Sequence, residues 1–191
     1  MAKTVSVRIK LLRQVPPGGR AAEVGVFEGD FSEKILRVAK PEKLYLIDPW
    51  ENFDEPGLEN AMYGAGSEHD MAAIYEDVRA RFDRPISRGR VEMLRSRSQD
   101  ALGAMGDGTL DFIYIDGDHR YEGVAADLQD ALRVVRIGGL IALDDHGLGG
   151  WWGDGVVRAT NEALGRHAQA LRVVFCAKRQ IMLEKTAEIA R

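Results

Sequence analysis

Apolar runs alternate with amphipathic helical patterns along most of the chain. Runs typical of buried strands stand at residues 21–27, 43–48, 90–94, 110–116, 139–144, 171–177 and 180–184. Apolar residues at helical spacing lie between them, at 35–39, 71–82, 121–135 and 156–167. Strands that alternate with helices predict a mainly parallel sheet covered by helices on both faces.

The last two apolar runs break this alternation. Only Lys178 and Arg179 separate them, and a two-residue connection can join only antiparallel strands. We therefore predict an α/β fold in which five parallel strands are followed by a C-terminal antiparallel hairpin. The chain has 191 residues, against roughly 150 for a typical domain, so one domain is expected over residues 1–191.

The charge balance bears on the class of partner. Acidic residues outnumber basic ones by 30 to 26, for a net charge of −4, which disfavours binding to nucleic acid or to an anionic membrane. Arginines are frequent between residues 81 and 97, but such a run is usually a solvated face. A small-molecule substrate is favoured, with neither nucleic acid nor membrane expected as a partner.

Cysteine usage and hydropathy bear on the compartment. The single cysteine, Cys176, lies in an apolar run, which predicts a buried thiol and no internal disulfide. No window approaches 18 apolar residues, and residues 1–15 lack the apolar stretch of a signal peptide. These features favour a reducing, cytoplasmic setting.

Acids and glycines stand at the ends of the first two predicted strands, where open parallel sheets bind their ligands. Gly25 and Gly29 lead from the first strand into a helix, so the backbone can approach a ligand closely. Asp48 ends the second strand, 19 residues beyond Gly29, and an acid there typically accepts hydrogen bonds from ribose hydroxyls. Simple turn glycines and a helix-capping acid are the alternative.

The fourth and fifth predicted strands also end in acids, Asp116 and the pair Asp144 and Asp145. Because these strands should be neighbours, the three carboxylates are expected to converge. Their oxygens suit Mg²⁺, Mn²⁺ or Ca²⁺, whereas nitrogen from His119 and His146 would tolerate Zn²⁺ or Fe²⁺. Helix capping by one or two of the acids near these strand ends is the alternative.

Taken together, these motifs resemble those of class I S-adenosylmethionine-dependent methyltransferases. They are Glu23-x-Gly25-x-x-x-Gly29, Asp48, the block Asp116-Gly117-Asp118-His119-x-Tyr121-Glu122, and the turn Gly138-Gly139 that leads to Asp144-Asp145-His146. More narrowly, residues 20–185 are similar to small bacterial methyltransferases built around an IDGDHxYEGV block. The resemblance implies a Rossmann-like, seven-stranded, mainly parallel sheet with helices on both faces and a reversed C-terminal hairpin, in agreement with the strand pattern.

The resemblance also implies a set of residues around S-adenosylmethionine. Glu23 would face the methionine amino group, and Asp48 the ribose hydroxyls. The methionine portion would lie against Gly25 and Gly29, and the adenosine against Trp50. The other members of the set are Phe27, Asp116 and Ser98. Ser98 would lie near the adenine, at a position where many relatives carry an acid.

A second similarity is to metal-dependent O-methyltransferases of the catechol type. Those enzymes carry a metal-binding Asp at the end of strand four and two further ligands 28 and 29 residues later, a spacing that Asp116, Asp144 and Asp145 reproduce. The similarity implies a divalent metal there, Mg²⁺ before Mn²⁺. The lysine base of that type is replaced by His119, which becomes the candidate base, with His146 as its substitute and Asp116 as a further catalytic residue.

The predicted function is methyl transfer to a hydroxyl group of a small molecule, because a bound divalent ion would acidify and orient that hydroxyl. Four aromatic residues would wall the acceptor pocket: Phe53, Tyr63, Trp151 and Trp152. For the stretch Gly150-Trp151-Trp152-Gly153, an interface or packing patch is the alternative. The irregular stretch 51–69 is typical of a lid, a binding loop or a disordered segment. Oligomeric state is left open, a homo-oligomer included.

Three alternatives remain. A nicotinamide oxidoreductase shares the fold, but its G-x-G-x-x-G loop is absent and Glu28 would repel a pyrophosphate. A relative of this fold can use the same acids to hold iron for oxygen chemistry. A non-catalytic module can keep the S-adenosylmethionine pocket without turnover.

Overall fold

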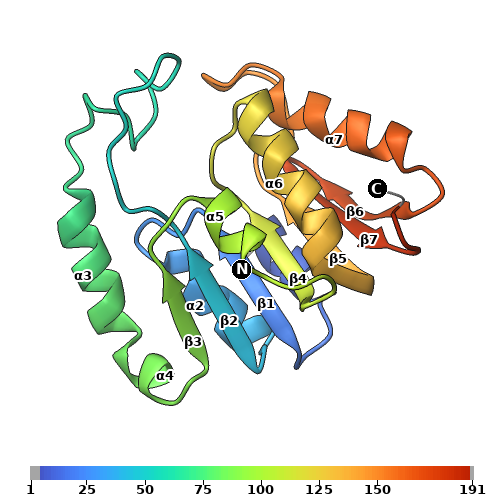
Figure 1. Cartoon of the computed structure of the whole chain (residues 1–191), viewed down its shortest axis with the longest axis horizontal. Coiled ribbons are helices and arrows are strands. Elements are labelled where there is room, and N and C mark those ends of the chain that lie inside the picture. The colour runs from blue at the N-terminus through green and yellow to red at the C-terminus, as the bar shows by residue number, and fades with distance from the viewer. Residues whose placement is uncertain (1–4, 190–191) are drawn as a thin grey trace.

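A seven-stranded sheet forms the centre of the computed structural model, which describes residues 5–189 (Figure 1). The strands are β1 (Arg20–Val24), β2 (Lys43–Ile47), β3 (Val91–Leu94), β4 (Leu110–Ile115), β5 (Val135–Leu143), β6 (Leu171–Ala177) and β7 (Gln180–Lys185). They lie in the order β3-β2-β1-β4-β5-β7-β6. The first five pair in parallel, and β7 is antiparallel to both β5 and β6. The predicted fold class and its C-terminal antiparallel hairpin are confirmed.

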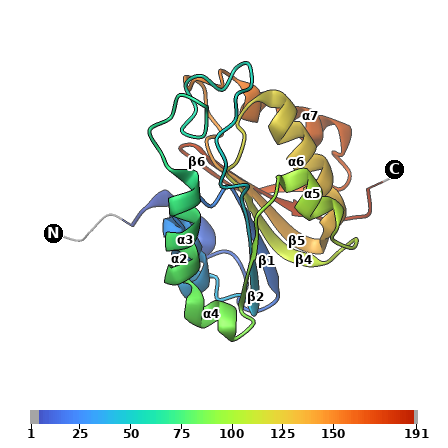
Figure 2. The same cartoon turned by 60° about the vertical axis from the view of Figure 1, so that its left-hand side comes forward.

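Helices cover both faces of this sheet. They are α1 (Val7–Leu12), α2 (Asp30–Val38), α3 (Met71–Arg81), α4 (Asp83–Ser87), α5 (Ser98–Gly103), α6 (Tyr121–Val134) and α7 (Gly155–Arg166). Figure 2 shows α2, α3 and α4 on one side of the sheet and α5, α6 and α7 on the other. The hydrophobic pattern did not predict α1, α4 and α5, because five or six residues are too few to display helical periodicity. Across residues 5–189, every helix is too short or too polar to span a lipid bilayer.

Two apolar clusters, one on each face, hold the helices against the sheet. The first contains Leu12 of α1 and Ile35 of α2, and the second contains Leu128 of α6. The central strand β4 contributes to both, and its residues Phe112 and Ile113 point to opposite faces and are at most 1% exposed. Burial on both faces explains why the central strands read as continuous apolar runs.

Two details differ from the sequence-based expectation. Strand β1 ends at Val24 rather than residue 27, because Gly25 turns the chain with a φ of +82°. Cys176 is exposed rather than buried, since β6 is the edge strand of the sheet and this side chain faces solvent. The thiol is therefore accessible despite its apolar neighbours.

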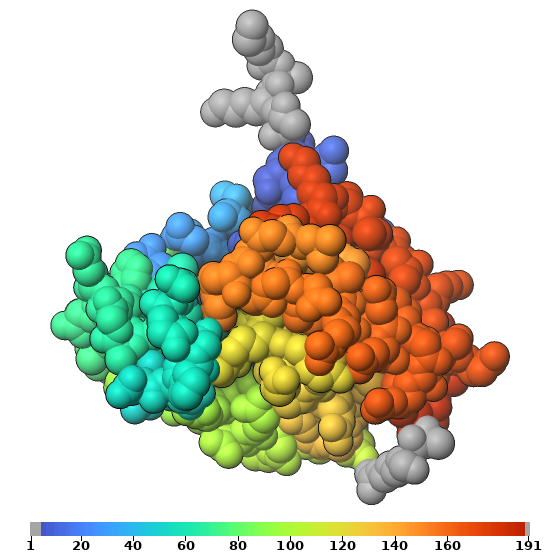
Figure 3. Space-filling view, turned by 90° about the horizontal axis from the view of Figure 1, so that it is seen from above, coloured from blue at the N-terminus to red at the C-terminus, as the bar shows by residue number. Residues whose placement is uncertain are grey.

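Two long loops rise from the carboxyl edge of the sheet. The segment 48–70, which follows β2, folds back on itself: the Phe53 N–H donates to the Tyr63 carbonyl at 2.8 Å, and the Ala65 N–H donates to the Phe53 carbonyl at 2.9 Å. The segment 144–154, which follows β5, faces it, and the two lie side by side in Figure 3. The Tyr63 and Trp151 rings meet edge to face, 6.4 Å apart, so the loops touch above the strand ends.

We expect Leu12→Ala to destabilise the protein. Leu12 is fully buried in the cluster that holds α1 to the sheet, and truncation of such a side chain costs about 2–5 kcal/mol of unfolding free energy. Leu148→Ala is the matched control, because Leu148 is 73% exposed and its truncation should cost less than about 0.5 kcal/mol. Urea unfolding of both variants checks this, and equal losses would show that α1 is not held as described.

Candidate active site

A cavity of about 620 Å³ opens at the carboxyl edge, beneath the two loops. Eight of the predicted site residues line it: Glu23, Gly25, Phe27, Asp48, Ser98, Asp116, His119 and Asp145. Four lie outside its lining: Gly29, Trp50, Asp144 and His146. The topology brings the strand ends together because β1 lies between β2 and β4. The prediction of a ligand site at these strand ends therefore coincides with this cavity.

Asp48 shapes the loop that follows β1. Its Oδ2 accepts hydrogen bonds from the N–H groups of Val26 at 2.9 Å and Phe27 at 3.0 Å, and its Oδ1 accepts one from Trp50 at 2.7 Å. Burial raises the pKa of Asp48, and these three hydrogen bonds oppose that shift by favouring the carboxylate. Asp48 thus presents its carboxylate to the cavity and also fixes the backbone of the loop that follows β1.

The two glycines of this loop serve different purposes. A Cβ on Gly25 would lie 2.1 Å from the Asp116 carbonyl oxygen, so only glycine lets the ends of β1 and β4 approach this closely. A Cβ on Gly29 would lie 2.7 Å from the Phe82 ring. Gly25 is therefore required at the cavity itself, whereas Gly29 is required for packing behind it.

Glu23 is a buried carboxyl at the bottom of the cavity. It is 1% exposed and accepts a hydrogen bond from the Ser32 hydroxyl. Desolvation by burial raises its pKa to about 8, and the nearby carboxylates of Asp116 and Asp48 add to the rise. A positive charge placed beside Glu23 would stabilise its anion, so this end of the cavity is suited to a cationic group.

Trp50 does not offer a ring face to the cavity, contrary to its predicted place along an adenosine. It is 1% exposed, and its Nε1 donates to the Phe27 carbonyl at 2.9 Å. Its ring packs edge to face on Tyr75, with centroids 5.2 Å apart. Trp50 packs beneath the loop that follows β1 and supports it. Burial of its large apolar ring is more favourable in free energy than exposure to solvent.

Ser98 lines the cavity and leads to an acid that the sequence analysis missed. Its hydroxyl donates to Asp127 Oδ1 at 2.5 Å. Asp127 is 1% exposed, and burial raises its pKa to about 7. The available signal was an acid on the apolar face of α6, three residues after Val124 and next to Leu128.

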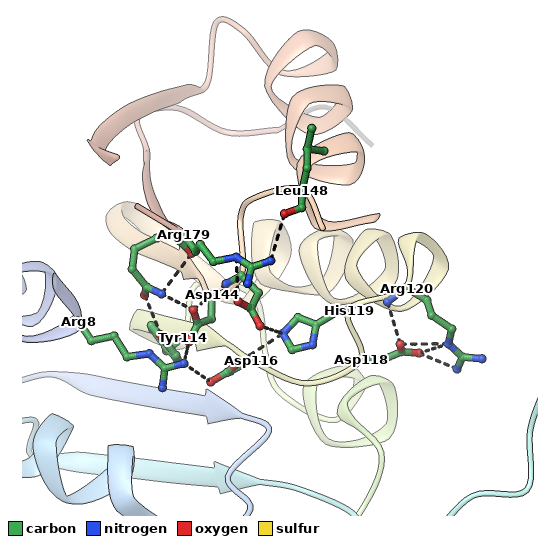
Figure 4. A network of polar contacts seen from close by, with 11 residues as sticks. Arg8, Tyr114, Asp116, Asp118, His119, Arg120, Asp144, Leu148 and Arg179 are labelled. Atoms are coloured by element: carbon green, nitrogen blue, oxygen red, sulfur yellow. Dashed lines mark hydrogen bonds and ion pairs between the residues drawn. The ribbon is translucent and has the colours of Figure 1, made fainter. Parts of the chain in front are cut away.

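His119 lies at the centre of the polar network (Figure 4). Its side chain is 15% exposed, and Nε2 lies 3.3 Å from Asp116 Oδ1 and 3.8 Å from Asp145 Oδ2. The imidazole also packs on the Trp152 ring, with centroids 4.8 Å apart. His119 therefore faces two carboxylates on one side and an aromatic wall on the other.

The three carboxylates predicted to bind a metal are already paired with groups of the chain. Asp144 accepts hydrogen bonds from the Tyr114 hydroxyl at 2.8 Å and from the Gln180 side-chain amide, and it forms an ion pair with Arg8. Asp145 Oδ1 lies 3.4 Å from Arg179 Nε, and Asp116 Oδ2 lies 3.5 Å from Arg8 Nη2.

Among residues 5–189, no group of three His, Cys, Asp or Glu side chains is arranged to hold a metal ion. The donor set does not fit a divalent ion in this arrangement, because protein donors hold Asp144 and a guanidinium group lies beside each of the three carboxylates. The predicted metal site at Asp116, Asp144 and Asp145 receives no support from the geometry.

Asp118 and His146, which are adjacent in sequence to His119 and Asp145, are placed differently from His119. The Asp118 carboxylate accepts a hydrogen bond from Arg120 Nη2 at 2.7 Å, and Arg120 Nη1 donates to the Pro56 carbonyl at 3.1 Å, which ties the connection between β4 and α6 to the segment 48–70. His146, the substitute base, lies outside the cavity lining, and burial lowers its pKa. Neither Asp118 nor His146 is placed as His119 is.

The outer part of the cavity is aromatic. It is lined by Phe53, Tyr63, Trp151 and Trp152, as predicted for the acceptor pocket. Within the described part of the chain, three buried polar atoms of the cavity lining have no hydrogen-bond partner: Tyr63 Oη, Trp152 Nε1 and His119 Nε2. Unpaired buried groups are costly in a folded protein, so these atoms suit hydrogen bonds to a ligand.

A sequence model of a family described as a methyltransferase domain matches residues 22–146, well over half of the chain. The chain belongs to this methyltransferase family. The matched segment of this methyltransferase runs from β1 to His146, directly after Asp144 and Asp145. No curated protein matches the sequence significantly.

Solved structures share the fold of this methyltransferase at low sequence identity. The O-methyltransferase NovP superposes with a TM-score of 0.65 at 20% identity, over 94% of this chain and 80% of its own. SMU.1697c from Streptococcus mutans, solved in complex with SAH, gives 0.62 at 13%, over 95% and 99%. An rRNA methylase from Streptococcus thermophilus gives 0.64 at 9%, over 98% and 99%. The fold is that of class I S-adenosylmethionine-dependent methyltransferases.

We expect Glu23→Gln to change how stability depends on pH. Glu23 keeps its proton to about pH 8 in the folded protein but releases it near its ordinary pKa of 4.5 when unfolded. Between these values the unfolding free energy should fall as pH rises, on the order of 1.4 kcal/mol per pH unit. The variant should flatten this fall.

Urea unfolding between about pH 5.5 and 8.5 measures this slope. Asp127, whose pKa is also raised, leaves a residual slope at the lower end of that range. Glu122→Gln is the matched control, since Glu122 is exposed on α6 and should leave the slope unchanged. A slope in Glu23→Gln equal to that of the wild type would contradict the assignment.

Proposed function

We propose that this methyltransferase binds S-adenosylmethionine at the ends of β1 and β2 and transfers its methyl group to a hydroxyl of a small molecule. The observation that carries the proposal is the position of His119. Its Nε2 is buried without a hydrogen-bond partner in the described residues and lies 3.3 Å from Asp116 Oδ1, where the polar strand ends meet the aromatic wall.

The strand-end half of the cavity suits the cofactor. Glu23 is a buried carboxyl whose raised pKa falls when a cation such as the methionine ammonium approaches. Asp48 keeps acceptor capacity for ribose hydroxyls beyond its three backbone hydrogen bonds. Ser98, held by Asp127, borders the same half.

The reaction needs one proton acceptor. When bound, S-adenosylmethionine supplies an electrophilic methyl, which the acceptor oxygen takes as the carbon–sulfur bond breaks. His119 Nε2 takes the proton of the acceptor hydroxyl, and the Asp116 and Asp145 carboxylates, at 3.3 and 3.8 Å, stabilise the resulting imidazolium. The aromatic wall excludes water and orients the acceptor. No step of this scheme passes through a metal, because a guanidinium group lies beside each of the three candidate ligands.

A small acceptor fits the charges better than a nucleic acid does. The arginines of residues 81–97 are partly engaged by the chain: Arg81 pairs with Asp30 and Glu33, and Arg97 Nη2 lies 2.6 Å from Glu55 Oε1. The net charge of −4 works against a polyanion. A cytoplasmic location stays part of the proposal on the sequence features alone.

Calorimetry with S-adenosylmethionine and S-adenosylhomocysteine should detect binding to the wild type and about tenfold or greater weakening in Asp48→Asn. The loss follows because a charged hydrogen-bond acceptor contributes roughly 1.5–3 kcal/mol. Asp77→Asn, an exposed substitution on α3, is the matched control and should bind as the wild type does. Absence of binding to the wild type, or equal affinity in Asp48→Asn, would overturn the cofactor assignment.

Methyl transfer from labelled S-adenosylmethionine to a panel of hydroxyl-bearing acceptors should depend on His119. His119→Ala and His119→Gln should lower kcat by roughly 10² or more, since a general base contributes about 10² to 10⁴, while S-adenosylhomocysteine affinity stays near that of the wild type. His167→Ala, outside the cavity lining, is the control. If His119 variants keep turnover and His146→Ala loses it, His146 is the base; binding without any turnover would indicate a non-catalytic module.

A further inference from the structure

Arg8 occupies the place for which the sequence predicts a metal ion. Its guanidinium points between the ends of β4 and β5 (Figure 4), forms an ion pair with Asp144 Oδ2, and its Nη2 lies 3.5 Å from Asp116 Oδ2. It also lies against the Phe31 ring, with Cζ 5.4 Å from the centroid. Arg8 belongs to the cavity lining, although it is 136 residues away from Asp144 in sequence.

The packing of α1 directs Arg8 into this position. Leu11 and Leu12 follow it by three and four residues and therefore share its face of the helix. Both are fully buried in the cluster that also contains Ile35 and Phe31. Because these leucines face the core, the guanidinium on the same face of α1 lies towards the sheet, while 37% of the Arg8 side chain stays exposed.

The neighbours of Arg8 complete the neutralisation of the acids. Asp144 is 2% exposed, and such a buried carboxylate needs a counter-charge or full hydrogen bonding. It receives both, from Arg8 on one side and from Tyr114 and Gln180 on the other.

Asp116 links Arg8 to the candidate base. Its Oδ2 faces Arg8 at 3.5 Å, and its Oδ1 faces His119 Nε2 at 3.3 Å. The two oxygens of one carboxylate thus connect a permanent cation with an imidazole that must gain a proton during turnover. A cation on Oδ2 fixes the orientation in which Oδ1 supports His119.

We propose that Arg8 is the resident cation of this site: it holds Asp116 and Asp144 in place of a divalent metal, and it positions His119 through Asp116. Methyl transfer by this chain accordingly needs no divalent metal. The inference rests on the proposed function for its catalytic part, but the exclusion of metal by Arg8 is a property of the folded protein and is measured separately.

Binding of Mn²⁺, followed by the electron paramagnetic resonance signal of the free ion, tests the exclusion. The wild type should bind no Mn²⁺ at this site, and Arg8→Ala should gain one site at least about tenfold tighter than any wild-type binding, because a positive charge is removed from between two carboxylates. The site should vanish in Arg8→Ala/Asp144→Asn. Arg8→Lys should exclude Mn²⁺ as the wild type does, since it restores the charge.

Arg13→Ala is the matched control, an exposed arginine at the end of the same helix, and should leave Mn²⁺ binding absent. A cooperative urea-unfolding transition, measured for each variant, shows that it is folded independently of cofactor binding. A wild type that binds one Mn²⁺ and loses it in Asp144→Asn overturns the proposal even if Arg8→Ala does not fold. A folded Arg8→Ala that binds no Mn²⁺ overturns it as well.

Turnover separates the two parts of the inference. Methyl transfer by the wild type should survive EDTA unchanged, whereas Arg8→Ala should lose kcat about tenfold or more with little change in KM for S-adenosylmethionine, because the loss acts through the base. Loss of wild-type turnover in EDTA would overturn the metal-free assignment. If S-adenosylhomocysteine does not bind at all, the proposed function fails, while the Mn²⁺ result still decides the role of Arg8.

Discussion

Crowding of carboxyl groups at one edge of a sheet is the constraint on which the rest of this structure depends. Five acids meet at the ends of β1, β2, β4 and β5: Glu23, Asp48, Asp116, Asp144 and Asp145. Their mutual repulsion is relieved in three different ways. Glu23 keeps its proton, Asp48 is held by backbone N–H groups, and Asp144 pairs with an arginine. These solutions are physical alternatives, and each leaves a different chemistry at its position.

The way in which each acid is compensated determines which ligand groups the two ends of the cavity can bind. Around Glu23 and Asp48, the acids are compensated by a proton and by backbone N–H groups. A bound cation or a hydroxyl donor can therefore still form stabilising interactions with the acids at this end. Around Asp144 and Asp145, guanidinium groups already compensate the acids, so a further cation would not be stabilised at this end. The free acceptor atom between the two ends is His119 Nε2. Polarity along the cavity therefore follows from how each acid was neutralised.

Local patterns in the sequence predicted much of this arrangement, and long-range contacts account for the remainder. Alternating apolar runs and the two-residue connection at Lys178 and Arg179 were sufficient to predict a mainly parallel sheet with a reversed hairpin, since both signals are local. The acids of the strand ends were identified for the same reason. The pairing of Arg8 with Asp144 leaves no trace in local periodicity, and neither does that of Arg179 with Asp145. Trp50 was misjudged because a strand-end position does not reveal which way a side chain packs.

The place of β7 in the sheet has a consequence for synthesis on the ribosome. Residues 180–185 form the last strand to be made, yet they lie between β5 and β6, and the turn before them carries the Arg179 that meets Asp145. Until these residues emerge, the nascent chain presents β5 with an unpaired edge and apolar flanks, the kind of surface that invites aggregation. The half of the cavity built on β1, β2 and β4 can assemble early, whereas the half built on β5 waits until β7 has been made.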